Sequence, residues 1–131
     1  MRLIYLPTLM FLLLFAVAAK ADPIDNIAGF LKQGNAQALS NLFATSVEVT
    51  ILDQENLYSD TQATLVINKF FTDNKPKSVK ILHRVNSSSS YLFGVMFLTT
   101  DNGVYRISVT LNGSSGNMKI IELRIEAEKT K

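Results

Sequence analysis

The chain has 131 residues, 13 of them Lys or Arg and 11 Asp or Glu, and it contains neither Cys nor Trp. This length allows one domain. Without cysteine the chain has no disulfide, no thiolate zinc site, no thiol nucleophile and no lipid-anchoring cysteine. A single histidine, His83, excludes a multi-histidine metal site. We therefore expect neither a metal centre nor a cofactor.

Residues 1–21 predict a secretory signal peptide. Arg2 supplies a charged start, residues 3–17 form an apolar run, and Ala19-Lys20-Ala21 is an A-x-A cleavage site. Cleavage after Ala19 or Ala21 would place the protein in the periplasm or outside the cell; an uncleaved N-terminal anchor is the alternative. Removing residues 1–21 leaves eleven basic and eleven acidic residues. A neutral mature chain does not favour a nucleic-acid partner, and no later segment has the length and apolarity of a membrane span.

The mature chain is expected to open with a helix. Asp22 and Pro23 are typical of a helix N-terminus, and Gly34 is typical of a helix end. Between them the apolar side chains follow one helical stripe: Ile24, Ile27, Ala28 and Leu31.

A short helix and a strand are expected next. Asn35 can cap the helix, whose inner side would carry Leu39, Leu42 and Phe43. Residues 47–51 then alternate between apolar and polar, which predicts a strand. Residues 53–58 are polar and predict a loop.

The clearest helical pattern covers residues 61–71. Ser59 and Gln62 form a capping box at its start, and Pro76 lies in the segment that ends it. The apolar positions recur at helical spacing: Ala63, Val66, Ile67, Phe70 and Phe71. Such a face needs a broad apolar surface to cover, which favours packing on a sheet.

The remaining sequence predicts four strands joined by turns. The strands are expected at residues 79–85, 91–100, 105–111 and 121–125. Sequential hairpins predict an antiparallel sheet, with the helices on one face. Residues 22–131 therefore form a single α+β domain. His83 alternates in phase with Val79, Ile81 and Val85, so we expect it to face the apolar interior.

Several short motifs, in this order and spacing, resemble those of known proteins. They are Tyr58-Ser59 with Gln62-Ala63, Phe70-Phe71, His83, Gly103-Val104-Tyr105-Arg106 and Ile121-Glu122-Leu123-Arg124-Ile125-Glu126. The order of elements resembles the nuclear transport factor 2-like fold, also called cystatin-like, in which a curved sheet wraps around helices as a cone. More closely, the chain resembles a family of small exported Bacteroidetes proteins of unknown function. The resemblance implies the fold and no activity, because this fold hosts isomerases, dehydratases and binding modules alike.

Seven side chains are candidates for a pocket or an interface. His83 could orient a ligand, and the Arg106 guanidinium could grip a carboxylate in two places. The strand charges lie opposite the apolar face of their own strands, which indicates a solvated sheet face, a polar cavity wall or a dimer face. The candidates are Tyr58, Phe70, His83, Tyr91, Arg106, Glu122 and Arg124.

No acid, base and nucleophile form a catalytic constellation. The main hypothesis is therefore an exported, non-catalytic module that binds a small apolar or anionic ligand between helix 61–71 and the sheet, or binds a protein partner. One alternative is a proton-transfer enzyme of the isomerase or dehydratase type, with His83 or Asp53 as base and Tyr58 as donor. The other is a structural domain that forms a homodimer through the sheet.

Overall fold

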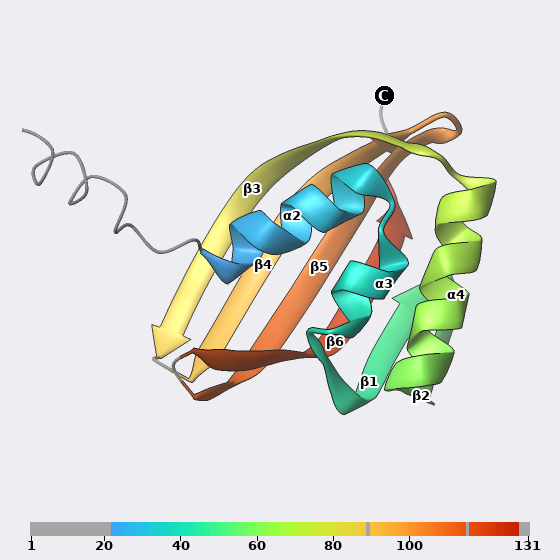
Figure 1. Ribbon diagram of the computed structural model, residues 1–131. Coiled ribbons are helices and arrows are strands. Elements are labelled where there is room, and N and C mark those ends of the chain that lie inside the picture. The colour runs from blue at the N-terminus through green and yellow to red at the C-terminus, as the bar shows by residue number, and fades with distance from the viewer. Residues whose placement is uncertain (1–21, 89, 115, 129–131) are drawn as a thin grey trace, which may run out of the picture.

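The computed structural model describes residues 22–88, 90–114 and 116–128, so the expected signal peptide at residues 1–21 lies outside the described part. Two helices, a β-hairpin, a long helix and four strands follow one another (Figure 1). The elements are α2 (Pro23–Gln33), α3 (Ala36–Ser40), β1 (Phe43–Ile51), β2 (Gln54–Ser59), α4 (Asp60–Asp73), β3 (Pro76–Ser88), β4 (Tyr91–Thr100), β5 (Gly103–Ser114) and β6 (Asn117–Ala127).

The six strands form one sheet in the order β2-β1-β6-β5-β4-β3. All neighbouring strands are antiparallel except β1 and β6, which are parallel. The expectation of a purely antiparallel sheet was therefore wrong. The reason is the path of the chain: α4 carries it from one edge of the sheet to the other, and three hairpins then bring it back until β6 lies beside β1.

The segment expected to be a polar loop contains the edge strand β2. Residues Gln54–Ser59 pair with β1 along its length, from Ile51 opposite Gln54 to Ser46 opposite Ser59. Most of the β2 side chains are exposed, so the strand lacks the alternation that would reveal it. The backbone ladder of β1 stabilises it instead. Phe43, expected on the short helix, begins β1.

The helix ends agree with the local sequence signals. The carboxylate of Asp22 accepts the backbone N–H of Ile24, and Gly34 ends α2 with φ at 66°. Ser59 and Gln62 form the expected capping box of α4, with both reciprocal hydrogen bonds present. These signals act within a few residues, which is why the sequence could predict them.

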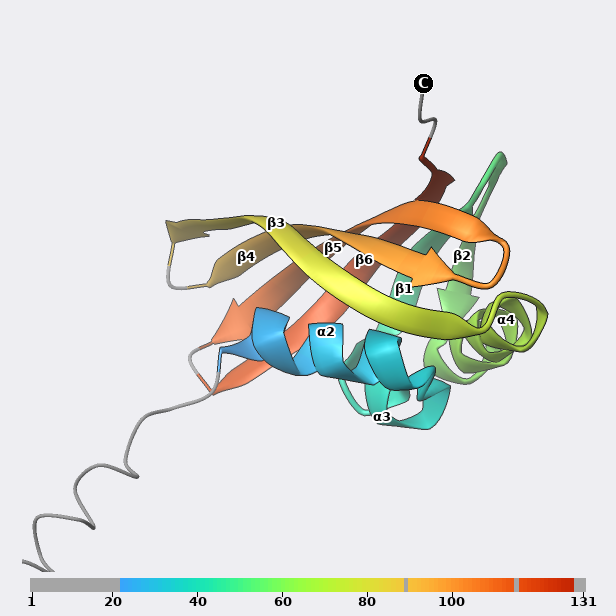
Figure 2. The ribbon, with the colours of Figure 1, turned by 90° about the horizontal axis from the view of Figure 1, so that it is seen from above.

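All three helices cover the same face of the curved sheet, as Figure 2 shows. The core lies between this inner face and the helices, whereas no helix covers the outer face in the described part of the chain. The helices contribute Ile24, Ile27, Leu31, Leu39, Ile67, Phe70 and Phe71, and the sheet contributes Val47, Val49, Met96, Leu98, Ile107, Val109, Leu111, Leu123 and Ile125.

Helix α2 is held on the sheet by one close approach and one ion-pair cluster. A Cβ at Gly94 of β4 would lie 2.9 Å from Cδ1 of Ile24, so the absent side chain lets the helix approach. The guanidinium of Arg84 on β3 bonds Asp22 at 2.7 Å and Asp25 at 2.6 Å. The hydrogen bond from Arg84 lowers the pKa of Asp25. Together these contacts orient the first helix of the domain.

Candidate functional site

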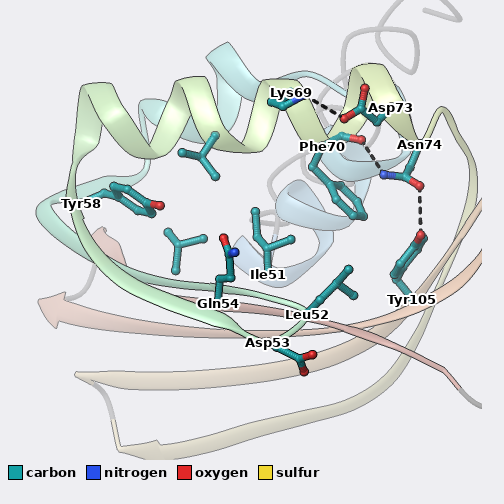
Figure 3. A pocket seen from close by; sticks show the side chains of 12 residues that line it. Ile51, Leu52, Asp53, Gln54, Tyr58, Lys69, Phe70, Asp73, Asn74 and Tyr105 are labelled. Atoms are coloured by element: carbon teal, nitrogen blue, oxygen red, sulfur yellow. Dashed lines mark hydrogen bonds and ion pairs between the residues drawn. The ribbon is translucent and has the colours of Figure 1, made fainter.

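A cavity of about 570 Å³ opens between α4 and the β1–β2 hairpin (Figure 3). One wall is α4 and the other is the hairpin. Both α4 and β1 also contribute side chains to the core, so the cavity lies between the core and solvent. Twelve residues line it: Val49, Ile51, Leu52, Asp53, Gln54, Tyr58, Val66, Lys69, Phe70, Asp73, Asn74 and Tyr105. Of the seven candidates from the sequence, Tyr58 and Phe70 lie here.

The middle of the cavity is apolar. Its lining includes Val66 and Phe70 from α4 and Val49 and Ile51 from β1. The ring of Phe70 packs edge-on against Tyr105, with centroids 5.0 Å apart and planes at 80°. Tyr58 lies at the opposite end of the cavity from Tyr105 in Figure 3. A ligand between the helix and the sheet would therefore lie against aliphatic and aromatic side chains.

A polar network closes the Tyr105 end. The hydroxyl of Tyr105 donates to Oδ1 of Asn74 at 2.9 Å, and the Asn74 amide donates to the carbonyl oxygen of Phe70 at 3.1 Å. Asn102, in the β4–β5 turn, also donates to Oδ1 of Asn74 at 2.9 Å. These bonds connect the end of α4 to β5 and its preceding turn, which makes this end of the cavity preorganised.

The mouth of the cavity carries the charged side chains. Lys69 and Asp73 form an ion pair at 3.2 Å one helical turn apart on α4, and both are largely exposed. Asp53 lies in the β1–β2 turn and is also exposed. In Figure 3 its carboxyl group points away from the hydroxyl of Tyr58. The two groups of the proposed proton-transfer pair therefore do not converge on one point.

Leu52, beside Asp53, has a strained backbone. Its φ is 58°, a left-handed conformation that is unfavourable for leucine by about 1 kcal/mol. The backbone N–H of Leu52 donates to the carbonyl oxygen of Ile125 on β6 at 2.7 Å, which holds the turn in place. The side chain, 48% exposed, lines the cavity mouth. The turn thus holds an apolar side chain at the entrance at some conformational cost.

His83 does not face the interior, contrary to the expectation from strand alternation. The pairing of β3 with β4 changes register after Ile81. Ile81 pairs with Met96, and His83, two residues later, pairs with Val95, only one residue away on β4. This bulge reverses the phase of β3, so Arg84 turns toward α2 and the exposed His83 turns to the outer face. Tyr91, at the start of β4, is 41% exposed and is not among the residues that line the cavity beside α4.

Arg106, Glu122 and Arg124 lie together on the outer face of the sheet. The backbone register places Arg106 opposite Glu126, and Arg124 opposite both Ser108 and Thr50. Arg124 contacts Glu126 at 3.1 Å and Glu122 at 4.0 Å. The sequence allowed these charged side chains to form a solvated sheet face, a polar cavity wall or a dimer face. In the structure they lie on a solvated face of the sheet, and none of them lines the cavity.

Carboxylates crowd the same face near β2. A hydrogen bond with Glu55 raises the pKa of Glu48, and the negative charge of Glu55 acts in the same direction. Below them Thr50 is buried, and its hydroxyl oxygen has no hydrogen-bond partner among the described residues. This end of the outer face is therefore acidic, while Arg106 and Arg124 lie nearer its centre.

Sequence reasoning missed most of the cavity lining. Asn74, Tyr105 and Lys69 were not candidates, although Tyr105 lay within one of the motifs and on the apolar phase of its strand. Leu52 belonged to no predicted element, Gln54 lay in the segment predicted to be a polar loop, and Asp73 lay in the segment predicted to end the helix. Within the described residues no group of three or more His, Asp or Glu side chains could hold a metal ion. No helix in residues 22–88, 90–114 or 116–128 is long and apolar enough to cross a membrane.

Solved structures share this architecture. A DUF4783 family protein from Bacteroides uniformis is 21% identical, with 83% of this chain and 100% of that chain covered and a TM-score of 0.78. A DUF4783 family protein from Bacteroides fragilis is 24% identical, with 78% and 95% covered and a TM-score of 0.73. A domain of unknown function with a cystatin-like fold from Nostoc punctiforme is 10% identical, with 86% and 81% covered and a TM-score of 0.65.

These similarities confirm the expected α+β, nuclear transport factor 2-like (cystatin-like) fold. No curated protein matches the chain. The family model described as Domain of unknown function (DUF4783) matches residues 24–126. The resemblance to a Bacteroidetes family of unknown function is thereby confirmed: this chain, over nearly its whole described length, belongs to the DUF4783 family.

Proposed function

We propose that this protein is an exported, non-catalytic module that binds a small molecule with a large apolar part. The observation that carries the proposal is the open cavity between α4 and the β1–β2 hairpin, about 570 Å³ in volume. Ligand sites commonly occupy about 300–1,000 Å³ and combine apolar walls with a few polar groups. Here Val49, Ile51, Val66 and Phe70 supply the walls, and Asn74 belongs to the polar end.

The same geometry argues against the proton-transfer alternative. General acid–base catalysis requires the two groups to converge on the substrate within hydrogen-bond reach. Asp53 and Tyr58 both line the cavity but point apart, and His83 lies on the other face of the sheet. Export belongs to the same proposal and rests on the signal pattern in residues 1–21, which places the module in the periplasm or outside the cell.

Filling the cavity should weaken binding without unfolding the domain. In Val66→Phe the larger ring would occupy the space between α4 and β1, and we expect the affinity for the neutral fluorescent dye N-phenyl-1-naphthylamine to fall about tenfold or more. Dye titration of residues 22–131 measures this. Asn68→Phe, on the exposed side of the same helix, is the matched control and should stay within about twofold. Equal affinities of the two variants would place the dye outside the cavity and overturn the proposal.

A second candidate function is self-association through the outer face of the sheet. The observation that favours it is a mixed surface that none of the described helices covers: Val85 and Leu57 are 46% and 71% exposed, and half-buried Phe93 and Phe97 lie on the same face. Charges of both signs, including Arg106 and the acidic cluster around Glu48, would suit a second copy packed face to face.

Sedimentation velocity over a range of concentrations tests this candidate. Arg106 is 47% exposed and its Nε lies 4.0 Å from Oε1 of Glu128, a long ion pair that leaves much of the guanidinium accessible to a second copy. We expect Arg106→Ala to weaken a wild-type dimer, whereas Lys69→Ala, on the helix side of the sheet, should leave it unchanged. A wild-type protein that remains monomeric at millimolar concentration would exclude this function.

A further inference from the structure

More acidic than basic side chains line the cavity among the described residues. Asp53 and Asp73 both line it, whereas Lys69 is the one basic side chain among its twelve lining residues in the described chain. Asp53 lies in the β1–β2 turn, and Asp73 lies on α4 across the opening (Figure 3). With two acidic residues and one basic residue in the lining, its formal charge is negative.

The single lysine is already neutralised. Its Nζ lies 3.2 Å from Oδ2 of Asp73, at the i,i+4 spacing that favours such pairs. An anionic ligand would have to compete with Asp73 for Lys69 and would also approach Asp53, whose carboxylate has no ion pair in the described part of the chain. A cationic group would face Asp53 without such competition. The side-chain amide oxygen of Gln54, next to Asp53, is a further acceptor in the lining.

The C-terminal end of α4 also favours a cation at the cavity. The helix ends at Asp73, its last turn contains no basic residue, and Asn74 caps it beside the cavity. The aligned carbonyl groups give the C-terminus of a helix a partial negative charge, which favours cations nearby. In α4 this effect is reduced, because the carbonyl oxygens of Phe70 and Asp73 already accept hydrogen bonds from the amides of Asn74 and Asn102. This contribution comes from the backbone and is independent of the two carboxylates.

We infer that the cavity takes an amphipathic amine: a molecule whose apolar body lies against Val66 and Phe70 and whose ammonium group lies at the cavity mouth beside Asp53. This inference rests on the proposed function and specifies its ligand class. It selects against the anionic ligand that the sequence had left open. Apolar contact supplies most of the affinity, because both carboxylates are exposed to solvent and attract a cation only modestly.

The test is competition between three molecules with one tail and different heads. Octylamine, octanol and octanoate displace N-phenyl-1-naphthylamine from the wild-type protein at neutral pH and low salt. We expect octylamine to bind about fivefold more tightly than octanoate, with octanol between them. Added salt should bring the three affinities together, because exposed charges are screened.

Substitutions of the two aspartates test which side chains cause the preference for octylamine. Asp53→Asn should reduce the preference for octylamine about threefold. The double variant Asp53→Asn, Asp73→Asn leaves Lys69 as the one charged side chain among the described lining residues and should prefer octanoate. Glu122→Gln changes the net charge by the same amount on the outer face of the sheet, so it is the matched control and should keep the wild-type preference. Both aspartates are exposed, so the variants are expected to fold.

The outcomes separate the two proposals. If neither the dye nor any octyl compound binds the wild-type protein, the proposed function fails and this inference fails with it. If the dye binds in the cavity but octanoate competes as well as octylamine, the binding function stands and the ligand class is wrong. A preference for octylamine that Glu122→Gln reduces as much as Asp53→Asn would assign the effect to net charge and also overturn the inference.

Discussion

Replacing Gly113 by alanine is expected to lower the free energy of unfolding by about 3 kcal/mol, or to prevent folding of the domain. Gly113 lies at the end of β5 with φ at 146°, outside the conformations that alanine adopts easily. A Cβ there would run into the carbonyl oxygen of Asn117 and would lie 3.2 Å from Cα of Met118. Both obstacles are backbone atoms of the paired strand β6, so the strand itself would have to move.

Urea denaturation of a glycine series measures this effect. Gly116→Ala is the matched control for backbone conformation alone, because its φ is 82° but, its chain neighbours aside, no described atom lies within 4 Å of the added Cβ; it should cost about 1 kcal/mol. Gly29→Ala, inside α2 with free space around it, should instead stabilise the protein by about 0.5–1 kcal/mol. If Gly113→Ala costs no more than Gly116→Ala, the steric argument is wrong.

The second large effect is expected for Phe70→Ala, which should lower the free energy of unfolding by about 3–5 kcal/mol. Phe70 is 6% exposed and connects α4 to the sheet through its edge-on contact with Tyr105. It also packs against Phe71, with centroids 6.2 Å apart. Its removal leaves a void that joins the existing cavity, and the neighbouring elements cannot close it without moving α4.

Leu65→Ala provides the control for this substitution. Leu65 is on the same helix but 67% exposed, so its loss should change the free energy of unfolding by no more than about 0.5 kcal/mol. Chemical denaturation of both variants gives the comparison. Similar losses of stability for the two would mean that Phe70 does not join α4 to the sheet, and the cavity wall would need a different explanation.

Several elements could be predicted because their signals are local. Asp22 and Gly34 bound α2, and Ser59 with Gln62 begins α4, through hydrogen bonds that span four residues or fewer. Periodicity marked the buried face of α4, including Ile67 and Phe70. These signals need no knowledge of the rest of the fold, since the helix backbone and its caps are formed by neighbouring residues.

Other elements could not be predicted because distant residues decide them. β2 is a strand since β1 lies beside it, although its own side chains are mostly exposed. The bulge after Ile81 changes the side of the sheet that His83 faces, and only the pairing of β3 with β4 reveals that bulge. A one-residue change of register moves every following side chain to the opposite face, so alternation along one strand was an insufficient guide.

The sequence by itself determined the α+β class, the helix ends, the order of the last four strands and the family resemblance, because capping, periodicity and turn residues act at short range. The tertiary structure decided that β6 lies parallel to β1 and that His83 is on the outer face. It also decided that Asn74 and Tyr105, 31 residues apart, share a hydrogen bond at one end of the cavity. A cavity is the space left between packed elements, so its shape and charge depend on contacts between residues far apart in the chain.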